Sequence, residues 1–123
     1  MATRRLPILF TGLNKAMAVL GILPRWSYVE VGDDEVKVRM SWAFSARIPR
    51  ASIRSAVPYE GVVYGWGAHG WRGRWLVNGS SRNIVELRID PRADARVVVF
   101  PIRLRTLRVS VTRPEELITA TAP

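Results

Sequence analysis

The segment richest in side chains that could do chemistry spans residues 65–82. It reads GWGAHGWRGRWLVNGSSR and combines glycines with arginines, a histidine and hydroxyl groups. Guanidinium groups pair well with phosphate or carboxylate, and glycine amides in an adjacent loop can hold the same anion. Arg72 and Arg74 are expected on one side of a strand. We predict an anion- or partner-binding site made of Trp66, His69, Arg72, Arg74, Asn78, Ser80, Ser81 and Arg82. The alternative is that these arginines only solvate an outer face.

The same segment contains the pattern G-x-G-x-x-G at residues 65–70, followed by Asp90 at the distance used for ribose recognition. In dinucleotide-binding folds such glycines open a helix whose N-terminus holds the pyrophosphate. Here strand-like residues follow, and 123 residues leave no room for a doubly wound sheet and a substrate domain. The pattern therefore favours a glycine-rich loop between two strands.

Other combinations that could support catalysis or metal binding are incomplete. The chain has no cysteine and one histidine, which excludes disulfides, zinc–thiolate sites and intrachain sites with two histidines. The acidic run at residues 33–35 lacks the spaced oxygen ligands of calcium loops, and a hairpin turn accounts for it. His69 has no recognisable serine nucleophile to activate. We predict no catalytic residues, no metal site and no cofactor.

The charge balance favours anionic partners. The formal net charge is +9, and arginines outnumber lysines by 17 to 2. Residues 72–113 hold ten arginines and three acidic residues, a field that attracts anions of any kind. A GC-rich genome also produces an arginine excess without selection for binding, so a merely solvated face is the alternative.

The elements that must position these residues are mostly strands. Every even position from Val36 to Ile48 is apolar, and most odd positions between them carry lysine, arginine or serine. This period of two predicts a half-buried antiparallel strand, or two in phase, with Trp42 facing inward. Because inward positions change parity between Leu104 and Leu107, we expect a bulge or break at residues 105–106. Further strands are expected at residues 26–31, 57–64, 71–77, 84–89 and 97–100, with a helical turn at 49–55 and a chain reversal at 91–94.

Helices are expected to flank the strands. One face of an amphipathic helix within residues 1–24 would carry Leu13, Ala16, Met17 and Leu20. The alternative is a signal peptide, because residues 16–18 match a small-x-small cleavage pattern after a basic and apolar start. Pro114 and the two following glutamates suit the first turn of a helix over residues 113–121. No apolar run approaches the roughly 20 residues that a membrane-spanning helix needs.

The order of elements predicts one mainly β domain: a helical segment at 1–24, a small barrel of about seven antiparallel strands at 25–112, and a C-terminal capping helix at 113–121. In two stretches, GWGAHGWRGRWLVNGSSRNIVELRID and LRVSVTRPEELI, the chain resembles the bacterial pleckstrin-homology-like (PH-like) domains, as found in small proteins of high-GC bacteria. The resemblance covers roughly residues 25–120 and implies a barrel plugged at one end by the last helix. It implies binding or scaffolding, with no functional residue to carry over.

We therefore predict a non-enzymatic binding or scaffold domain for an anionic lipid, a phosphate group, or a protein or peptide partner. It is expected in the cytoplasm, including the inner face of the membrane. A nucleic-acid-binding module is the alternative, less favoured because Trp71 and Trp75 share a face with Val77 and are expected in the core. A ligand carrier or enzyme with a pocket near Met40, Trp42 and Phe44 is the third hypothesis. The sequence does not indicate an oligomeric state.

Overall fold

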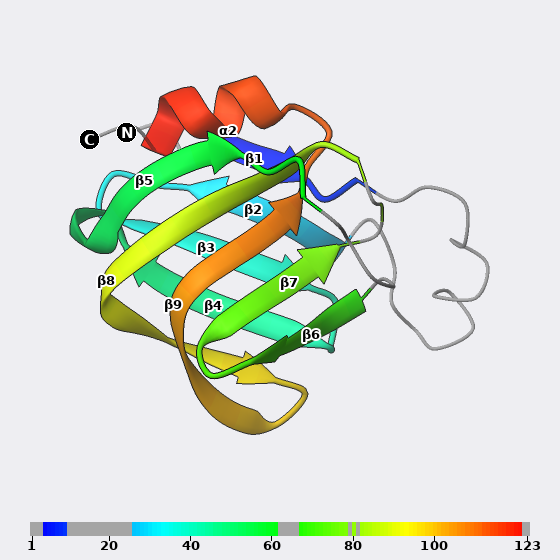
Figure 1. Ribbon diagram of the computed structural model, residues 1–123, viewed down its shortest axis with the longest axis vertical. Helices are drawn as coiled ribbons and strands as arrows, with labels where there is room; N and C mark the ends of the chain where they lie inside the picture. The colour runs from blue at the N-terminus through cyan, green and yellow to red at the C-terminus, as the bar shows by residue number, and fades with distance from the viewer. Residues whose placement is uncertain (1–3, 10–25, 62–66, 79, 81, 122–123) are drawn as a thin grey trace.

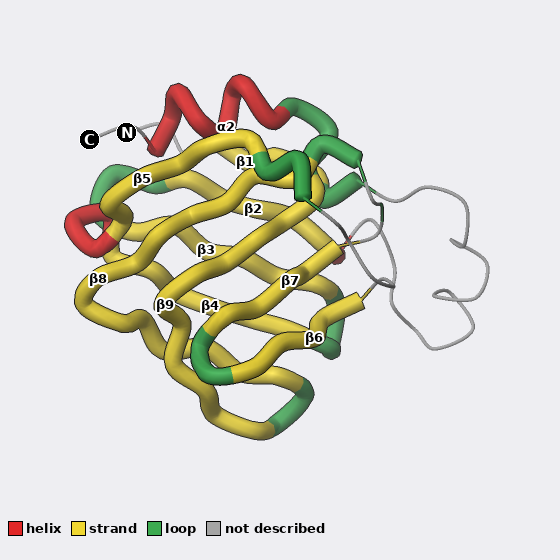
Figure 2. The backbone as a smooth tube through the Cα atoms, in the orientation of Figure 1, coloured by secondary structure: helices red, strands yellow, loops and turns green. Residues whose placement is uncertain are grey.

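The computed structural model describes residues 4–9, 26–61, 67–78, 80 and 82–121 (Figure 1). These residues are mainly β. They form one nine-stranded sheet that curls into a half-barrel, with a C-terminal helix packed over one end (Figures 1 and 2). The amphipathic helix and the cleavage pattern expected within residues 11–20 lie outside the described residues. Within the described part of the chain, no helix has the length and hydropathy that crossing a bilayer requires.

Nine strands make up the sheet in the described part of the chain. In chain order they are β1 (Arg4–Pro7), β2 (Ser27–Val31), β3 (Glu35–Met40), β4 (Phe44–Pro49), β5 (Ile53–Pro58), β6 (Gly67–Trp71), β7 (Arg74–Asn78), β8 (Ile84–Val97) and β9 (Phe100–Ser110). The 3-10 turn η2 (Arg50–Ser52) joins β4 to β5, and helix α2 (Pro114–Thr121) follows β9. Across the sheet the order is β1-β2-β3-β4-β8-β9-β7-β6, and β5 pairs with the first half of β8.

The alternation between residues 36 and 48 is confirmed as the pattern of β3 and β4. Their even residues are buried, and the strands form an antiparallel hairpin in which Val36 pairs with Ile48 and Met40 with Phe44. The expectation that Trp42 faces inward is wrong, because Trp42 lies in the turn between the strands and is 48% exposed. Ser41 opens this turn with a φ of 46°, which ends the two-residue alternation.

Strand β8 is long enough to pair with two different strands. Its first half pairs with β5 and its last residues with β4, because the strand bends where its register with β9 shifts between Arg88 and Ala93. Arg88 pairs with Thr106 and Ala93 with Leu104, which confirms the break expected at residues 105–106. The reversal expected at residues 91–94 is wrong: these residues form the bend, and the chain reverses at residues 98–99.

Three further expectations need correction. Residues 4–7, placed within a helical segment, form edge strand β1, because Leu6 and Ile8 follow a period of two and Pro7 tolerates an edge. The strand expected from residue 57 begins at Ile53, because the helical turn before it takes only three residues. The strands are not all antiparallel. Strand β8 runs in the direction opposite to β7, and β9 reverses the direction again. Strand β9 therefore runs the same way as β7 and pairs with it in parallel.

The core fills the concave side of the sheet beneath α2. The helix contacts β2, β5 and β8, and Leu117 is completely buried there. The ion pair between Arg4 and Glu116, with 3.5 Å between the charged atoms, joins β1 to the helix. The largest fully buried side chains are Leu6, Met40, Phe44, Ile48, Leu87, Leu104, Leu107 and Leu117. With the core on this side, the alternate polar side chains of the strands lie on the outer face.

Candidate basic anion-binding groove

A groove of about 850 Å³ crosses the outer face of β2, β3, β4, the second half of β8 and the first half of β9. We call it the basic groove. Most of its lining consists of the alternate residues that the core leaves outside: Tyr28, Lys37, Arg39, Ser45, Arg47, Asp94, Arg96, Pro101 and Arg103. Val38, Ala46, Ala95 and Ile102 complete it. Five cationic side chains and one carboxylate give this lining a net charge of +4.

The register of the sheet aligns the groove residues in rows. One row crosses five strands, from Tyr28 through Arg39, Ser45 and Arg96 to Pro101. The short side chain of Ser45 thus lies between two arginines, and the three form what we call the arginine row. Because neighbouring strands lie about 4.8 Å apart, the Cα atoms of Arg39 and Arg96 are separated by about 10 Å. Both guanidinium groups are long enough to meet over the Ser45 hydroxyl, a geometry suited to one anion held by three groups.

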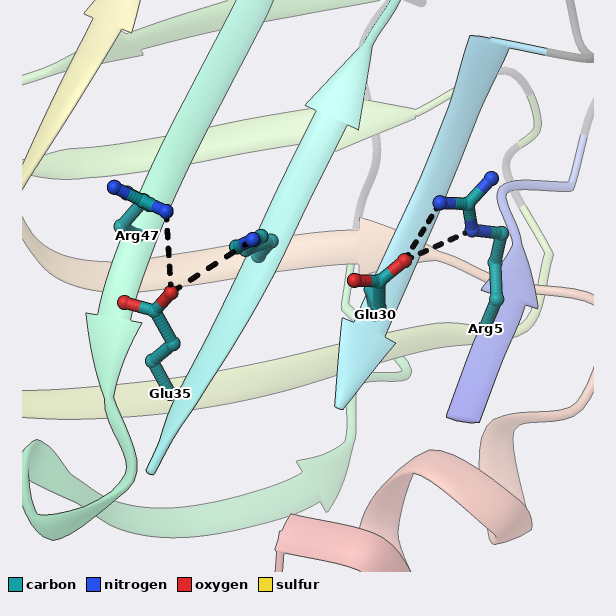
Figure 3. A network of polar contacts seen from close by, with 5 residues as sticks. Arg5, Glu30, Glu35 and Arg47 are labelled. Carbon is teal, nitrogen blue, oxygen red and sulfur yellow. Dashed lines mark hydrogen bonds and ion pairs between the residues drawn. The ribbon is translucent and has the colours of Figure 1, made fainter. Parts of the chain in front are cut away.

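The positive charge of the neighbouring residues is partly compensated. Glu35 Oε1 lies 3.4 Å from Arg47 Nη2 and 3.9 Å from Lys37 Nζ (Figure 3). On the other side of the groove, Arg103 Nε lies 3.7 Å from Asp94 Oδ1. These groups are well exposed, so each pair contributes little stability and is screened by salt.

The arginine row carries uncompensated charge. Arg39 donates its Nε to the Ser41 carbonyl at 3.1 Å, and no described carboxylate pairs with its terminal nitrogens. The Arg96 side chain is exposed and makes no hydrogen bond or ion pair with any residue that the structure describes. The strongest local attraction for an anion is therefore at Arg39 and Arg96.

At the β1 edge, Arg5 compensates the negative charge of Glu30, another acidic residue near the groove. Arg5 donates to Glu30 Oε2 from Nε at 3.0 Å and from Nη2 at 2.6 Å (Figure 3). This hydrogen bond raises the pKa of Arg5. The Arg5 guanidinium carbon also lies 4.1 Å from the centre of the Tyr28 ring. Glu30, which pairs across the strands with Lys37, is thus already neutralised, and Tyr28 is held at the end of the groove.

The arginines expected to form the site lie elsewhere, on the β6–β7 hairpin. The segment is not one strand. Trp71 pairs with Arg74 across a two-residue turn in which Arg72 has a φ of 53° and Gly73 a φ of 84°. Arg72 and Arg74 are both exposed, but they do not share the side of one strand as expected, because the chain reverses between them. Trp75 is partly buried against the core and Val77 is fully buried, as their alternation predicts.

Polar groups expected to bind a partner are turned inward after β7. Asn78 is completely buried and donates its Nδ2 to the Ser80 carbonyl at 2.8 Å. Ser80 is 4% exposed and accepts a hydrogen bond from the backbone N–H of Arg82 at 3.1 Å. These contacts shape the loop, and the Arg82 side chain is exposed beside them. Trp66 and Ser81 lie outside the described residues, as do the side chains of His69 and Trp71.

Arg105 links the hairpin to the basic groove. It follows Arg103 by two residues on β9, and its side chain lies so close to Gly73 that an added Cβ would be 2.8 Å from its Cγ. Sequence reasoning missed the arginine row because residue alternation marks Arg39 and Ser45 as outward-facing but does not reveal that β4 pairs with β8. The pairing of Ser45 with Arg96 joins residues 51 positions apart in the chain.

Among the ranges that the structure describes, no three histidine, cysteine, aspartate or glutamate side chains come together as a group that could hold a metal ion. Comparison with known proteins gives no match, since no family model, no curated protein and no solved structure is significantly similar to the chain.

Proposed function

We propose that this domain is a binding module that recognises a phosphate-bearing partner through the basic groove. The observation that carries the proposal is the arginine row, in which Arg39 and Arg96 flank Ser45 without an acidic neighbour in the row. Guanidinium groups bind phosphate oxygens in a bidentate manner, and a serine hydroxyl can donate a third hydrogen bond. The groove supplies donors and positive charge, which suit holding a ligand rather than transforming one.

We also infer that the domain is PH-like, as its sequence resemblance implies. The curled sheet and the helix α2 packed over one end support this inference. The parallel pairing of β7 with β9 departs from an all-antiparallel barrel, and the structure contains the additional strand β1. PH-like architecture fits a binding role without specifying the ligand.

A titration with inorganic pyrophosphate, monitored through the backbone amide chemical shifts of the protein, tests the proposed site. The largest shifts are expected around residues 39, 45 and 96. Because a hydrogen bond to a charged group contributes about 1.5–3 kcal/mol, Arg39→Ala combined with Arg96→Ala should weaken binding by at least about tenfold.

Two charge-matched variants provide the control. Arg72→Ala with Arg74→Ala removes the arginines of the hairpin, and Arg54→Ala with Arg88→Ala removes exposed arginines outside both regions. Neither should change affinity more than about twofold at near-physiological salt, where the Debye length is about 8 Å. Loss of binding in the hairpin variant with no loss in the groove variant would assign the function to the hairpin instead.

Single-stranded nucleic acid is the second candidate partner. The observation in its favour is that Trp42 and Phe100, which are 48% and 69% exposed, lie next to the groove and could stack on bases. Such binding should weaken steeply with added salt and should be lost on Trp42→Ala. If a fluorescent oligonucleotide does not bind the protein at low salt, this candidate is eliminated.

A further inference from the structure

Five large apolar side chains are exposed together at the end of the sheet that lies away from α2. We call this set the apolar rim, and it consists of Trp26 (51% exposed), Trp42 (48%), Val98 (47%), Val99 (72%) and Phe100 (69%). Backbone hydrogen bonds hold its segments side by side: Ser41 N–H donates to the Trp26 carbonyl at 2.9 Å, and Val98 N–H donates to the Ala43 carbonyl at 2.9 Å. In Figure 1 the turns after β3 and after β8 lie close together, opposite the helix.

The turn at residues 98–99 consists of two valines, although its backbone conformation does not favour valine. Val97 pairs with Phe100, so the loop has two residues, and Val98 occupies its first position with a φ of 60°. Two-residue hairpin loops with a positive φ at the first position favour glycine, asparagine or aspartate, and a β-branched residue is strained there. Contiguous exposed apolar surface commonly marks a docking region, and retained backbone strain is found at functional sites. Both observations indicate a docking role for the rim.

The rim lies next to the arginine row, where β3 and β8 end. Arg39 precedes Ser41 by two residues and donates to its carbonyl at 3.1 Å, and Arg96 precedes Val98 by two residues. Two residues of a strand span about 7 Å. Apolar side chains of interfacial proteins enter the boundary between headgroups and acyl chains by about 5–10 Å. When the rim is at that depth, Arg39 and Arg96 are therefore level with the lipid phosphates.

We propose that the apolar rim inserts into the surface of an anionic lipid bilayer while the arginine row binds the phosphates of its lipids. This inference rests on the proposed anion-binding function of the groove and names the partner. Charge complementarity supports it, because a negatively charged leaflet attracts the net positive groove lining. Tryptophan is favoured at the boundary between the apolar and the wet region of a bilayer, and phenylalanine is common among the apolar side chains that interfacial helices bury there. The adjoining valines have no ring to stack on a base, so the rim as a whole suits acyl chains better than nucleic acid.

Sedimentation with vesicles tests this proposal. The full chain is expected to bind vesicles of phosphatidylcholine mixed with phosphatidylserine, and to bind vesicles of phosphatidylcholine alone at least tenfold more weakly. Val99→Ser combined with Phe100→Ser should lower partitioning onto the anionic vesicles at least tenfold. It should leave the affinity for pyrophosphate unchanged, because the arginine row is intact. Val57→Ser, at an exposed apolar residue on β5 outside the rim, is the matched control and should bind vesicles like the wild type.

Depth is read out with brominated lipids, which quench tryptophans that enter the bilayer. We expect quenching of the wild type, reduced by Trp42→Phe. If the rim variant binds anionic vesicles as tightly as the wild type, or if no quenching occurs, insertion is refuted. If the wild type binds pyrophosphate but no vesicle, the membrane inference fails while the anion-binding function stands. If it binds neither, the proposed function fails as well.

Discussion

Arg50 donates its Nη2 to the carbonyl of Ala120 at 2.6 Å, which joins the turn after β4 to the last turn of α2. Its Nη1 also donates to the Gly32 carbonyl at 3.2 Å in the turn before β3. A single guanidinium group thus satisfies carbonyls from two elements and places positive charge at the C-terminal end of the helix, where the helix dipole favours it.

Arg50→Ala should destabilise the domain by about 1–3 kcal/mol, because a partly buried carbonyl at the helix end loses a charged donor. Chemical denaturation followed by circular dichroism measures the change. Arg54→Ala, which removes an exposed arginine whose Nε donates to the Asp90 carbonyl at 2.8 Å, should cost less. Equal losses in both variants would show that Arg50 has no special role in holding α2.

Leu117 attaches α2 to the core, and its truncation should be among the most damaging single changes. The side chain is completely buried, so Leu117→Ala should lower the free energy of unfolding by about 2–5 kcal/mol. Thermal unfolding is a suitable measurement. Ile118→Ala, at the next and only partly buried position, should cost less; the reverse order would mean that the helix packs through a different face.

Gly73 should resist substitution for two separate reasons. Its φ of 84° disfavours any side chain, and an added Cβ would lie 2.8 Å from Arg105 Cγ. We expect Gly73→Ala to destabilise the domain by about 1–2 kcal/mol. Making the same change in an Arg105→Ala background removes the contact with the Arg105 side chain, so the loss that persists comes from the positive φ and from the Arg103 carbonyl, 3.1 Å from the added Cβ. No loss in either background would contradict the left-handed turn.

Ser45 offers a way to close the groove without removing a charge. Ser45→Phe puts a bulky side chain between Arg39 and Arg96 on a strand face where aromatic residues are favoured, so stability should hold within about 1 kcal/mol. Pyrophosphate affinity should fall at least about tenfold, as in the double arginine variant. Ser55→Phe, on partly exposed β5 outside the groove, is the control. Undiminished binding by Ser45→Phe would show that the anion does not sit between the two arginines.

The strained turn of the apolar rim predicts opposite effects on stability and docking. Val98→Gly should raise the free energy of unfolding by about 0.5–1 kcal/mol, because glycine adopts the positive φ without strain. Vesicle binding should weaken at the same time, since an apolar side chain is lost. Val99→Gly, where φ is not positive, should weaken binding without raising stability. If Val98→Gly lowers the free energy of unfolding, the positive φ of Val98 is not a source of strain.

The local pattern of apolar and polar residues was sufficient to predict the strands that have one buried face and one solvent-exposed face. The strands at residues 36–48, the break at residues 105–106 and the final helix depend on the parity of apolar residues and on a proline–glutamate start, both visible in a short window. Local pattern was misleading where a turn lacks its usual residues. Arg72 and Val98 adopt positive φ angles that glycine or asparagine would have signalled, so the hairpin at residues 72–73 and the reversal at residues 98–99 were missed.

The site was harder to predict than the fold because it depends on pairing between distant segments. The arginine-rich composition correctly pointed to cationic surface, but it could not indicate that Arg96 lies opposite Ser45. The residues favoured from sequence, Asn78 and Ser80, are polar and follow a glycine-rich segment, yet their burial depends on loop hydrogen bonds that no periodicity encodes.

The bridge between Ile8 and Val111 has a consequence for how the chain is made. Backbone hydrogen bonds on both sides of it, from Leu9 N–H to the Ser110 carbonyl at 2.9 Å and from Thr112 N–H to the Pro7 carbonyl at 3.1 Å, tie the first strand to the end of the last. Val111 is synthesised 103 residues after Ile8, so this bridge can form only once β9 has been translated. The half-barrel therefore closes only after translation of β9. Until then, the edge of the first strand that pairs with residues 110–112 is exposed in the nascent chain, where such edges promote aggregation.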